Sequence, residues 1–248
     1  MSSPSPPALL RELAWDSRFF NLRIARVERD RLSGEELAEI ERERAARELD
    51  CVYFLAATED SATLARVAAA GWRFVDVRTT LALELGPAPD RPEVDRETVG
   101  LRRAEDVDVA ALRELAAGSH LDSRFYRDGR FPRPLCDRLF AEWIERSAEG
   151  LLADAVLVAG PRGAPRGYVT VRTSGEAPAD IGLLAVAPAA RGQGLGGALL
   201  AGAIAWARER GEPRLEVVTQ GANARAIRAY ERAGFTTRRV GYWFHAWR

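Results

Sequence analysis

Residues 183–200, LLAVAPAARGQGLGGALL, decide how the rest of the chain is interpreted. An apolar run leads into a proline, an arginine and a cluster of glycines, and a second apolar run begins directly after them. Gly192, Gly194 and Gly197 match the G-x-G-x-x-G pattern of dinucleotide-binding sheets. The first question is therefore which phosphate-bearing ligand this loop accepts.

The dinucleotide interpretation requires a context that this sequence lacks. Such a loop lies in the first strand–helix turn of a doubly wound sheet, and an acidic residue follows about 20 residues later to bind the ribose. Here the pattern begins at Gly192, too late for several further strand–helix units, and Thr219 and Gln220 stand where the acid belongs. A P-loop is excluded as well, because no Gly-Lys-Ser/Thr follows the glycines.

A second pattern, Arg191-x-x-Gly194-x-Gly196, fits the same residues better. It follows an apolar strand and opens a long helix. A loop without large side chains presents its backbone N–H groups beside the positive end of that helix. These groups would hold a pyrophosphate, with Arg191 supplying a full charge. The pattern resembles the acyl-CoA loop of the GCN5-related N-acetyltransferase (GNAT) family; the alternative is a glycine-rich helix start without a ligand.

The remaining sequence alternates apolar strands with segments of helical periodicity. Residues 86–97, rich in proline and charge, are the best linker candidate. Ser33 and Glu36 predict a capping box. We expect strands at 19–28, 51–57, 72–85, 98–104, 154–160, 166–174, 180–188, 214–220, 235–240 and 242–248, and helices at 33–50, 61–71, 104–119, 135–150, 194–211 and 223–234. The three strands between 154 and 188 are expected to be antiparallel neighbours.

The resemblance implies an α/β fold of the acyl-CoA N-acyltransferase type. Its mixed, mostly antiparallel sheet flanked by helices would occupy residues 98–248. Residues 1–88 would form a smaller α/β half that resembles a truncated domain of the same kind. We therefore expect two domains joined by the linker.

Two residues of the last predicted helix fit the same family. Asn223 starts the helix and Tyr230 lies seven residues later, which places both on one face, about 10 Å apart along the axis. In the family the matching Asn binds the pantetheine arm and the matching Tyr lies near the sulfur. The resemblance therefore implies acetyl-CoA as co-substrate, and no metal. Its binding residues would be Leu184, Ala185, Val186, Arg191, Gly192, Gln193, Gly194, Leu195, Gly196, Gly197, Asn223 and Tyr230.

Acetyl transfer also needs a gap between strands 180–188 and 214–220. We expect these strands to separate at Pro188, which cannot continue a ladder. The backbone from Leu184 to Val186 would then pair with the pantetheine arm as an added strand does. A backbone N–H at this point would stabilise the oxyanion, and Tyr230 would protonate the departing thiolate.

Segments spread over nearly the whole chain resemble one group within the family, the dTDP-fucosamine acetyltransferases; they include LAWDSRFFNLRIARV, SRFYRDGRF and VVTQGANARAIRAY. The resemblance implies acetylation of the 4-amino group of a dTDP-linked 4-amino-4,6-dideoxygalactose, with an acid at the end of the N-terminal half as base. Asp76 is the candidate base, with Glu216 and Asp180 as rivals and a solvent-facing charge as the alternative. Arg124 and Phe125 are the candidates for binding the diphosphate and the thymine.

Composition restricts the partners. The 36 basic and 36 acidic side chains leave zero net charge, which gives no indication of nucleic-acid binding. Two cysteines and two histidines without ligand spacing predict reduced thiols and no metal site. The longest apolar run, 197–207, is shorter than the roughly 20 residues that span a bilayer, and the N-terminus lacks the pattern of a secretion signal. We expect a cytoplasmic protein without membrane insertion.

Two other functions stay open at this point. The acceptor could be a peptide or protein amine or an aminoglycoside, or the chain could be a silent module that senses acyl-CoA. The arginine-rich stretch 120–134 suits a phosphorylated acceptor, and Tyr230 favours catalysis. The aromatic segment 242–248 could pack internally or across a homodimer.

Overall fold

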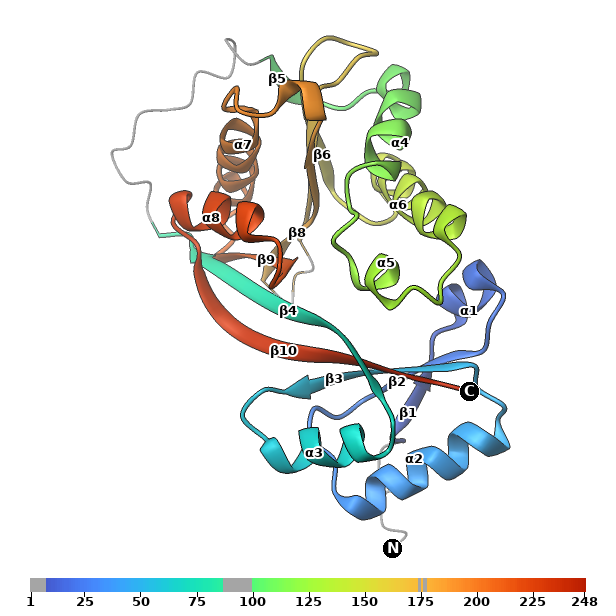
Figure 1. Cartoon of the computed structure of the whole chain (residues 1–248). Helices are drawn as coiled ribbons and strands as arrows, with labels where there is room; N and C mark the ends of the chain where they lie inside the picture. The colour runs from blue at the N-terminus through green and yellow to red at the C-terminus, as the bar shows by residue number, and fades with distance from the viewer. Residues whose placement is uncertain (1–7, 87–99, 174, 176–177) are drawn as a thin grey trace, which may run out of the picture. The chain divides into compact units, whose positions relative to one another are not determined.

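Figure 1 shows the computed structural model of the chain, which describes residues 8–86, 100–173, 175 and 178–248. The chain forms two compact units, and neither is continuous in sequence. The N-terminal unit holds the chain up to Arg78, Arg124–Phe131 and Val240–Arg248; the C-terminal unit holds Thr79–Ser123 and Pro132–Arg239. The division into domains 1–88 and 98–248 stays a prediction, and most of the predicted linker lies outside the described residues.

Most helices and strands belong wholly to one unit. The N-terminal unit contains β1 (Leu10–Glu12), α1 (Ala14–Phe20), β2 (Ile24–Val27), α2 (Gly34–Ala46), β3 (Cys51–Ala57), α3 (Ser61–Ala69) and α5 (Arg124–Asp128). The C-terminal unit contains β5 (Leu101–Arg103), η1 (Asp106–Asp108), α4 (Val109–Ala117), α6 (Arg133–Ala148), β6 (Ala155–Ala159), β7 (Gly167–Arg172), β8 (Ala179–Val186), η2 (Pro188–Ala190), α7 (Leu195–Glu209), β9 (Arg214–Gln220) and α8 (Ala224–Arg232). Strands β4 (Arg73–Glu84) and β10 (Thr236–Trp247) each have residues in both units. None of the described helices combines the length and the apolar composition needed to cross a membrane.

The N-terminal unit packs helices α2 and α3 against one face of its strands (Figure 1). β3 pairs in parallel with β2 and antiparallel with β10, and all of its residues are buried. Because side chains alternate across a strand, Val52 and Phe54 join the core beneath α2 and α3, while Tyr53 lies among aromatic rings on the opposite face. The predicted capping box of Ser33 and Glu36 is present at the start of α2.

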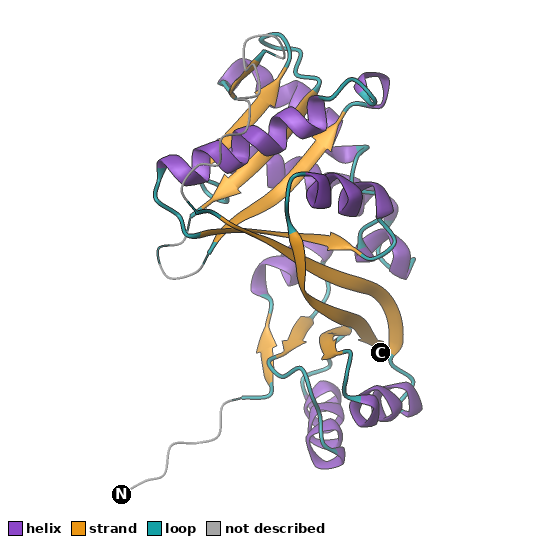
Figure 2. Ribbon diagram, turned by 90° about the vertical axis from the view of Figure 1, so that its left-hand side faces the viewer, coloured by secondary structure: helices purple, strands orange, loops and turns teal. Residues whose placement is uncertain are grey.

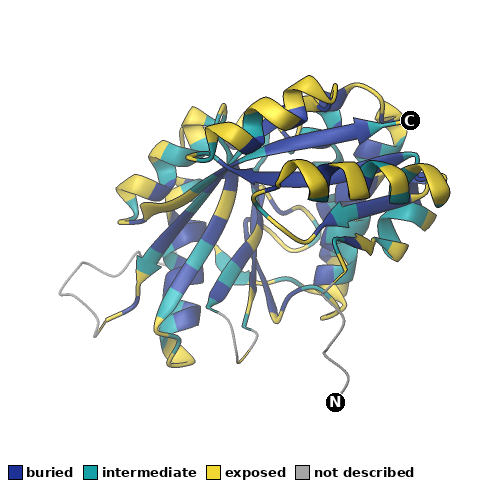
Figure 3. Cartoon of the chain, turned by 90° about the horizontal axis from the view of Figure 1, so that it is seen from below, coloured by how far each residue is buried: buried dark blue, intermediate teal, exposed yellow. Residues whose placement is uncertain are grey.

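The C-terminal unit is a sheet in the order β9-β8-β7-β6-β5 with helices on both faces (Figure 2). β8 and β9 are parallel. β6, β7 and β8 are antiparallel neighbours, as predicted, and β5 pairs antiparallel with β6. α7 contacts β6, β7 and β8 on one face, where Val169, Leu199 and Leu215 belong to the main core. Figure 3 shows the strands largely buried and the outer faces of the helices exposed. This mixed, mostly antiparallel sheet flanked by helices is the predicted α/β fold.

A buried ion pair holds the edge strand β5 in place. The Arg102 guanidinium donates to both carboxylate oxygens of Asp108, at 2.6 and 2.8 Å. Asp108 is fully buried and also accepts the backbone N–H groups of Glu105 and Gly163. The hydrogen bond from Arg102, helped by these backbone donors, lowers the pKa of Asp108 to about 2 in spite of its burial.

Two predicted strand assignments are wrong. The predicted strand at 19–28 is shorter, because Phe19 and Phe20 belong to α1, which ends at Asn21 in the left-handed conformation with φ of 54°. The predicted pair of terminal strands is one strand, β10. Gly241 lies within this strand and does not end it. The glycine is so close to β3 that a Cβ added to it would lie 2.8 Å from Leu55 Cδ1. The aromatic rings of this strand pack inside the chain.

Candidate active site

β8 and β9 separate partway along their length. Their parallel ladder ends with the pair Ile181 and Val217, although both strands continue beyond these residues. At the same level the β7–β8 register shifts, and the Leu183 N–H donates to Thr170 Oγ1 at 2.8 Å. The gap therefore begins at a β-bulge. The prediction that Pro188 separates the strands is wrong, because Pro188 lies well past the gap's beginning and starts η2.

Two residues of β8 turn backbone groups into this gap. The Ala187 N–H donates to the Arg166 carbonyl at 2.8 Å on the β7 side. In an antiparallel ladder alternate residues direct their N–H and C=O groups to the same side, so Ala185 also bonds toward β7. Leu184 and Val186 consequently direct theirs toward β9, where the ladder has already ended.

The glycine loop shapes the start of α7. Gly192 and Gly194 both have φ of 79°, in the left-handed region that favours glycine. Within the first turn of the helix, a Cβ added at Gly197 would meet nothing within 4 Å, and one at Gly196 would meet only the Val186 side chain at 3.9 Å. No side chain among the described residues caps this helix start. Its first N–H groups therefore lack the hydrogen-bond partners that groups further along a helix have.

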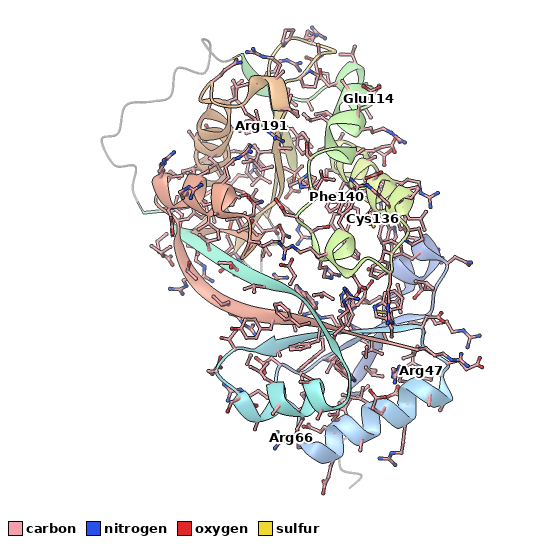
Figure 4. The ribbon with its side chains drawn as sticks, in the orientation of Figure 1. Arg47, Arg66, Glu114, Cys136, Phe140 and Arg191 are labelled. Atoms are coloured by element: carbon pink, nitrogen blue, oxygen red, sulfur yellow. The ribbon has the colours of Figure 1, made fainter. Side chains whose placement is uncertain are left out.

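Arg191 lies in the loop between η2 and α7 and is labelled in Figure 4. Its Nε donates to the Val186 carbonyl at 3.2 Å, which ties the glycine loop to the end of β8. Gln193 makes a second tie, because its Oε1 accepts from Arg166 at 3.3 Å and its Nε2 donates to the Ala189 carbonyl at 3.1 Å. Arg191 is exposed, so the rest of its guanidinium can reach an anion at the helix start.

Asn223 and Tyr230 occupy the two ends of α8. Asn223 is the N-cap, and its side-chain oxygen accepts from the Ala226 N–H at 3.1 Å. This bond leaves the two amide hydrogens of Asn223 for a ligand carbonyl. Tyr230 is buried in the same core cluster against which Leu184 and Val186 pack, and burial raises the pKa of its hydroxyl well above the ordinary value. The structure therefore joins Arg191 and Tyr230 to β8 and places Asn223 at the start of the helix that carries Tyr230.

The three acidic candidates differ in their surroundings. Asp76 is 2% exposed, which is not the solvent-facing placement that was its alternative. Its Oδ1 accepts from the Val77 N–H at 2.8 Å. Asp180 and Glu216 face each other across the paired part of the β8–β9 ladder. Both are ion-paired, Asp180 with Arg172 at 3.1 Å and Glu216 with Arg214 at 3.0 Å.

The predicted acceptor residues lie on α5 in the N-terminal unit. The Arg124 guanidinium carbon lies 4.8 Å from the ring centroid of Tyr53 and 4.6 Å from that of Trp243. Phe125 is 2% exposed and packs on Phe20, Phe131 and Tyr53. Its ring also lies under the Arg124 guanidinium, 4.2 Å from the guanidinium carbon. The role of Phe125 in binding thymine stays a prediction. Sequence reasoning missed Tyr53 and Trp243, because no local pattern joins these distant segments.

His245 and both cysteines are buried, and His120 is partly buried. His120 Nε2 lies 2.8 Å from the Tyr168 hydroxyl and its ring stacks on Phe140, and burial lowers its pKa to about 4. His245 is buried beside Asp128. The residues that the structure describes include no group of three His, Cys, Asp or Glu side chains suited to a metal ion.

Three comparisons relate the chain to known proteins. Residues 115–235 match the model of the acetyltransferase (GNAT) family. The dTDP-fucosamine acetyltransferase of Escherichia coli is 30% identical over 239 residues, which cover 96% of this chain and 98% of that protein. The spore coat polysaccharide biosynthesis protein SpsD of Bacillus subtilis is 33% identical over 143 residues, 58% of this chain and 49% of that protein. A GCN5-related N-acetyltransferase from Sphaerobacter thermophilus has a similar fold, with a TM-score of 0.60 at 19% identity over 96% of this chain and 76% of that one.

Proposed function

This chain belongs to the acetyltransferase (GNAT) family, and we propose that it transfers the acetyl group of acetyl-CoA to the 4-amino group of a dTDP-linked amino-deoxy sugar such as dTDP-4-amino-4,6-dideoxygalactose. The observation that carries the proposal is the gap beyond Ile181 and Val217, which opens beside an uncapped, glycine-lined helix start. The acceptor is supported by the relative named for dTDP-fucosamine, which aligns with nearly the full length of both chains.

The pyrophosphate and the pantetheine arm of acetyl-CoA each have complementary groups in this proposal. Backbone N–H groups at the start of α7 and the Arg191 guanidinium suit the pyrophosphate. The amide hydrogens of Asn223 suit a pantetheine carbonyl, and the inward backbone groups of Leu184 and Val186 suit the extended arm. These groups all come from one unit, from β8, the loop, the start of α7 and α8.

The transfer is direct. The neutral amine attacks the thioester carbonyl, and the backbone N–H of Leu184 or Val186 stabilises the oxyanion. When the tetrahedral intermediate collapses, the C–S bond breaks and the Tyr230 hydroxyl donates its proton to the thiolate. The raised pKa keeps Tyr230 protonated at neutral pH. The amine nitrogen gives up its proton to a base, for which Asp76 is our candidate, and holding both substrates in place supplies much of the rate.

We assign the acceptor's diphosphate to Arg124, whose guanidinium is held flat by aromatic rings, while Phe125 supports it from the core. Arg forms paired hydrogen bonds to phosphate oxygens when its plane is fixed. We further propose that the protein works in the cytoplasm, which agrees with two buried, reduced cysteines. A homodimer also stays a proposal, to be measured by light scattering during gel filtration.

The test is CoA release, followed with a thiol reagent, from acetyl-CoA and a panel of amines. The panel holds dTDP-4-amino-4,6-dideoxygalactose, its glucose epimer, a UDP-amino sugar, an aminoglycoside and a short peptide. Turnover confined to the dTDP-amino sugars supports the proposal. Turnover on the peptide or the aminoglycoside overturns the acceptor, and tight acetyl-CoA binding without any turnover favours an acyl-CoA sensor.

A further inference from the structure

Arg124 has unusual surroundings for a half-buried cation. Its guanidinium carbon lies within 5 Å of three aromatic ring centroids, those of Tyr53, Phe125 and Trp243. Among the residues that the structure describes, it has no ion pair or hydrogen bond, and its Nε is buried without a partner. Rings hold the plane of a guanidinium but leave its edge free for an anion. The rings alone do not fix where the guanidinium lies along β10, so another contact of α5 must do so.

Asp128, one turn later on α5, supplies a fixed point. It is 1% exposed, and its Oδ2 accepts from Trp247 Nε1 at 2.9 Å and from His245 Nδ1. Burial lowers the pKa of His245 to about 4, so the ring is neutral, and a carboxylate that only accepts places the proton on Nδ1. Burial disfavours the Asp128 charge, yet the bond from His245 keeps the pKa of Asp128 below its ordinary value.

The distance between Arg124 and Asp128 along α5 matches the distance between their partners along β10. Arg124 and Asp128 are four residues apart, which puts them on one face of α5 about 6 Å apart along the axis. Their partners Trp243 and His245 are two residues apart on β10, about 6.6 Å along the strand and on the same face. The helix therefore lies along β10 in a defined register, with Arg124 at Trp243 and Asp128 at His245.

We infer that Asp128 is a positioning residue: by bonding to His245 and Trp247 it sets the register of α5 on β10 and thereby holds the Arg124 guanidinium ready for the acceptor's diphosphate. The inference rests on the proposed function for the identity of that anion. Asp128 itself is buried and does not touch substrate. It acts on acceptor binding and leaves the acetyl-CoA site, which is built from the other unit, unchanged.

The test is a double-mutant cycle on the full chain, read out by calorimetric binding of dTDP and, separately, of acetyl-CoA. Arg124→Met should weaken dTDP binding by about tenfold or more, as expected for one charge-assisted contact to phosphate. Asp128→Ala should weaken it to a similar extent. The double variant should bind dTDP no more weakly than Arg124→Met, because Asp128 acts through Arg124. Acetyl-CoA binding should stay the same in all three.

Two variants keep the test decisive. Arg127→Ala removes the same charge from an exposed position of the same helix and should leave dTDP binding nearly unchanged, which separates positioning from general attraction. If Asp128→Ala loses acetyl-CoA binding through misfolding, Asp128→Asn replaces it, since the amide keeps the shape and one acceptor oxygen, and a loss of dTDP binding smaller than that of Arg124→Met is then expected.

Multiplicative losses in the double variant, or unchanged dTDP binding in the Asp128 variant that keeps acetyl-CoA binding, would overturn the inference, and so would a wild-type chain that does not bind dTDP. A wild-type chain that binds dTDP through Arg124 but acetylates no dTDP-amino sugar contradicts the proposed function alone.

Discussion

Ile181 and Val217 are the last residues that β8 and β9 pair, and everything proposed for acetyl-CoA lies beyond them. A parallel ladder normally uses the backbone groups of both strands along their shared length. Here the bulge at Thr170 and Leu183 turns β8 away, so the next N–H groups that face β9, those of Leu184 and Val186, are left for a ligand. A thioester bound in the gap would meet these donors without any rearrangement of the strands.

Gly197→Ala should raise stability and lower acetyl-CoA affinity at the same time. Alanine is favoured over glycine in a helix by up to about 1 kcal/mol, and the added methyl has open space around it. The same methyl would occupy the space that we assign to the pyrophosphate. Thermal unfolding and calorimetric titration with acetyl-CoA measure the two effects. Gly34→Ala, at the exposed start of α2 with equal space, is the matched control and should change stability only.

Asn223→Asp and Asn223→Ala should separate the two roles of this side chain. The aspartate keeps an oxygen that can cap α8, so stability should hold, while the amide donor to pantetheine is lost and the KM for acetyl-CoA rises. The alanine should also lose about 1 kcal/mol of unfolding free energy with the cap. Equal KM values in the wild type and Asn223→Asp would show that Asn223 is an N-cap only.

Tyr230→Phe should lower kcat by roughly a hundredfold, the lower range for loss of a general acid. The ring stays in the core beside Phe235, so acetyl-CoA affinity and thermal stability should change little. Because the pKa of Tyr230 is raised by burial, the wild-type rate should not decline between neutral and mildly alkaline pH through loss of this proton. An unchanged kcat would remove Tyr230 from the mechanism.

Asp76→Asn tests the base. The amide cannot accept a proton, so kcat/KM for the amino sugar should fall by about a hundredfold or more. Asp180→Asn, on a strand of the donor site but ion-paired with Arg172, is the control and should retain activity. The opposite result, with Asp180→Asn inactive and Asp76→Asn active, would assign the base to β8.

The Arg102–Asp108 pair predicts a stability change in acid. The folded pKa of Asp108 is about 2, below its ordinary value of 3.8. A carboxyl group whose pKa is lower in the folded state stabilises the fold fully at any pH above its pKa in the unfolded state. This stabilisation is lost as the pH falls to the pKa of the folded state. Urea unfolding should therefore show a loss between about pH 4 and about pH 2 that Asp108→Asn lacks. At neutral pH that variant should be less stable by roughly 3 kcal/mol, as for other broken buried pairs.

Local chemistry was readable from the sequence where neighbours in the chain act on each other. The capping box of Ser33 and Glu36 is contained in four residues, and the strand Cys51–Ala57 follows from an unbroken apolar run. Glycines at 192 and 194 mark the left-handed turns of the loop. These features depend on spacing alone, which a sequence displays directly.

Long-range packing was not readable in this way. The gap between β8 and β9 begins at a bulge where the Thr170 side chain of the neighbouring strand bonds to Leu183. Pro188 therefore predicted the wrong position for the separation of the strands. Gly241 signals a turn by composition, yet close approach to Leu55 keeps it within β10. The partners of Arg124 lie far away in sequence, and only the docking of α5 on β10 brings Trp243 and Tyr53 to it.

The most direct measurement is the structure of the product formed from carbon-13-labelled acetyl-CoA and dTDP-4-amino-4,6-dideoxygalactose. Our account predicts that mass spectrometry finds one added acetyl group and that nuclear magnetic resonance places the labelled carbonyl in an amide at the 4-position, with one CoA released for each amide formed. An unmodified sugar nucleotide, or CoA released without a labelled amide, would contradict it.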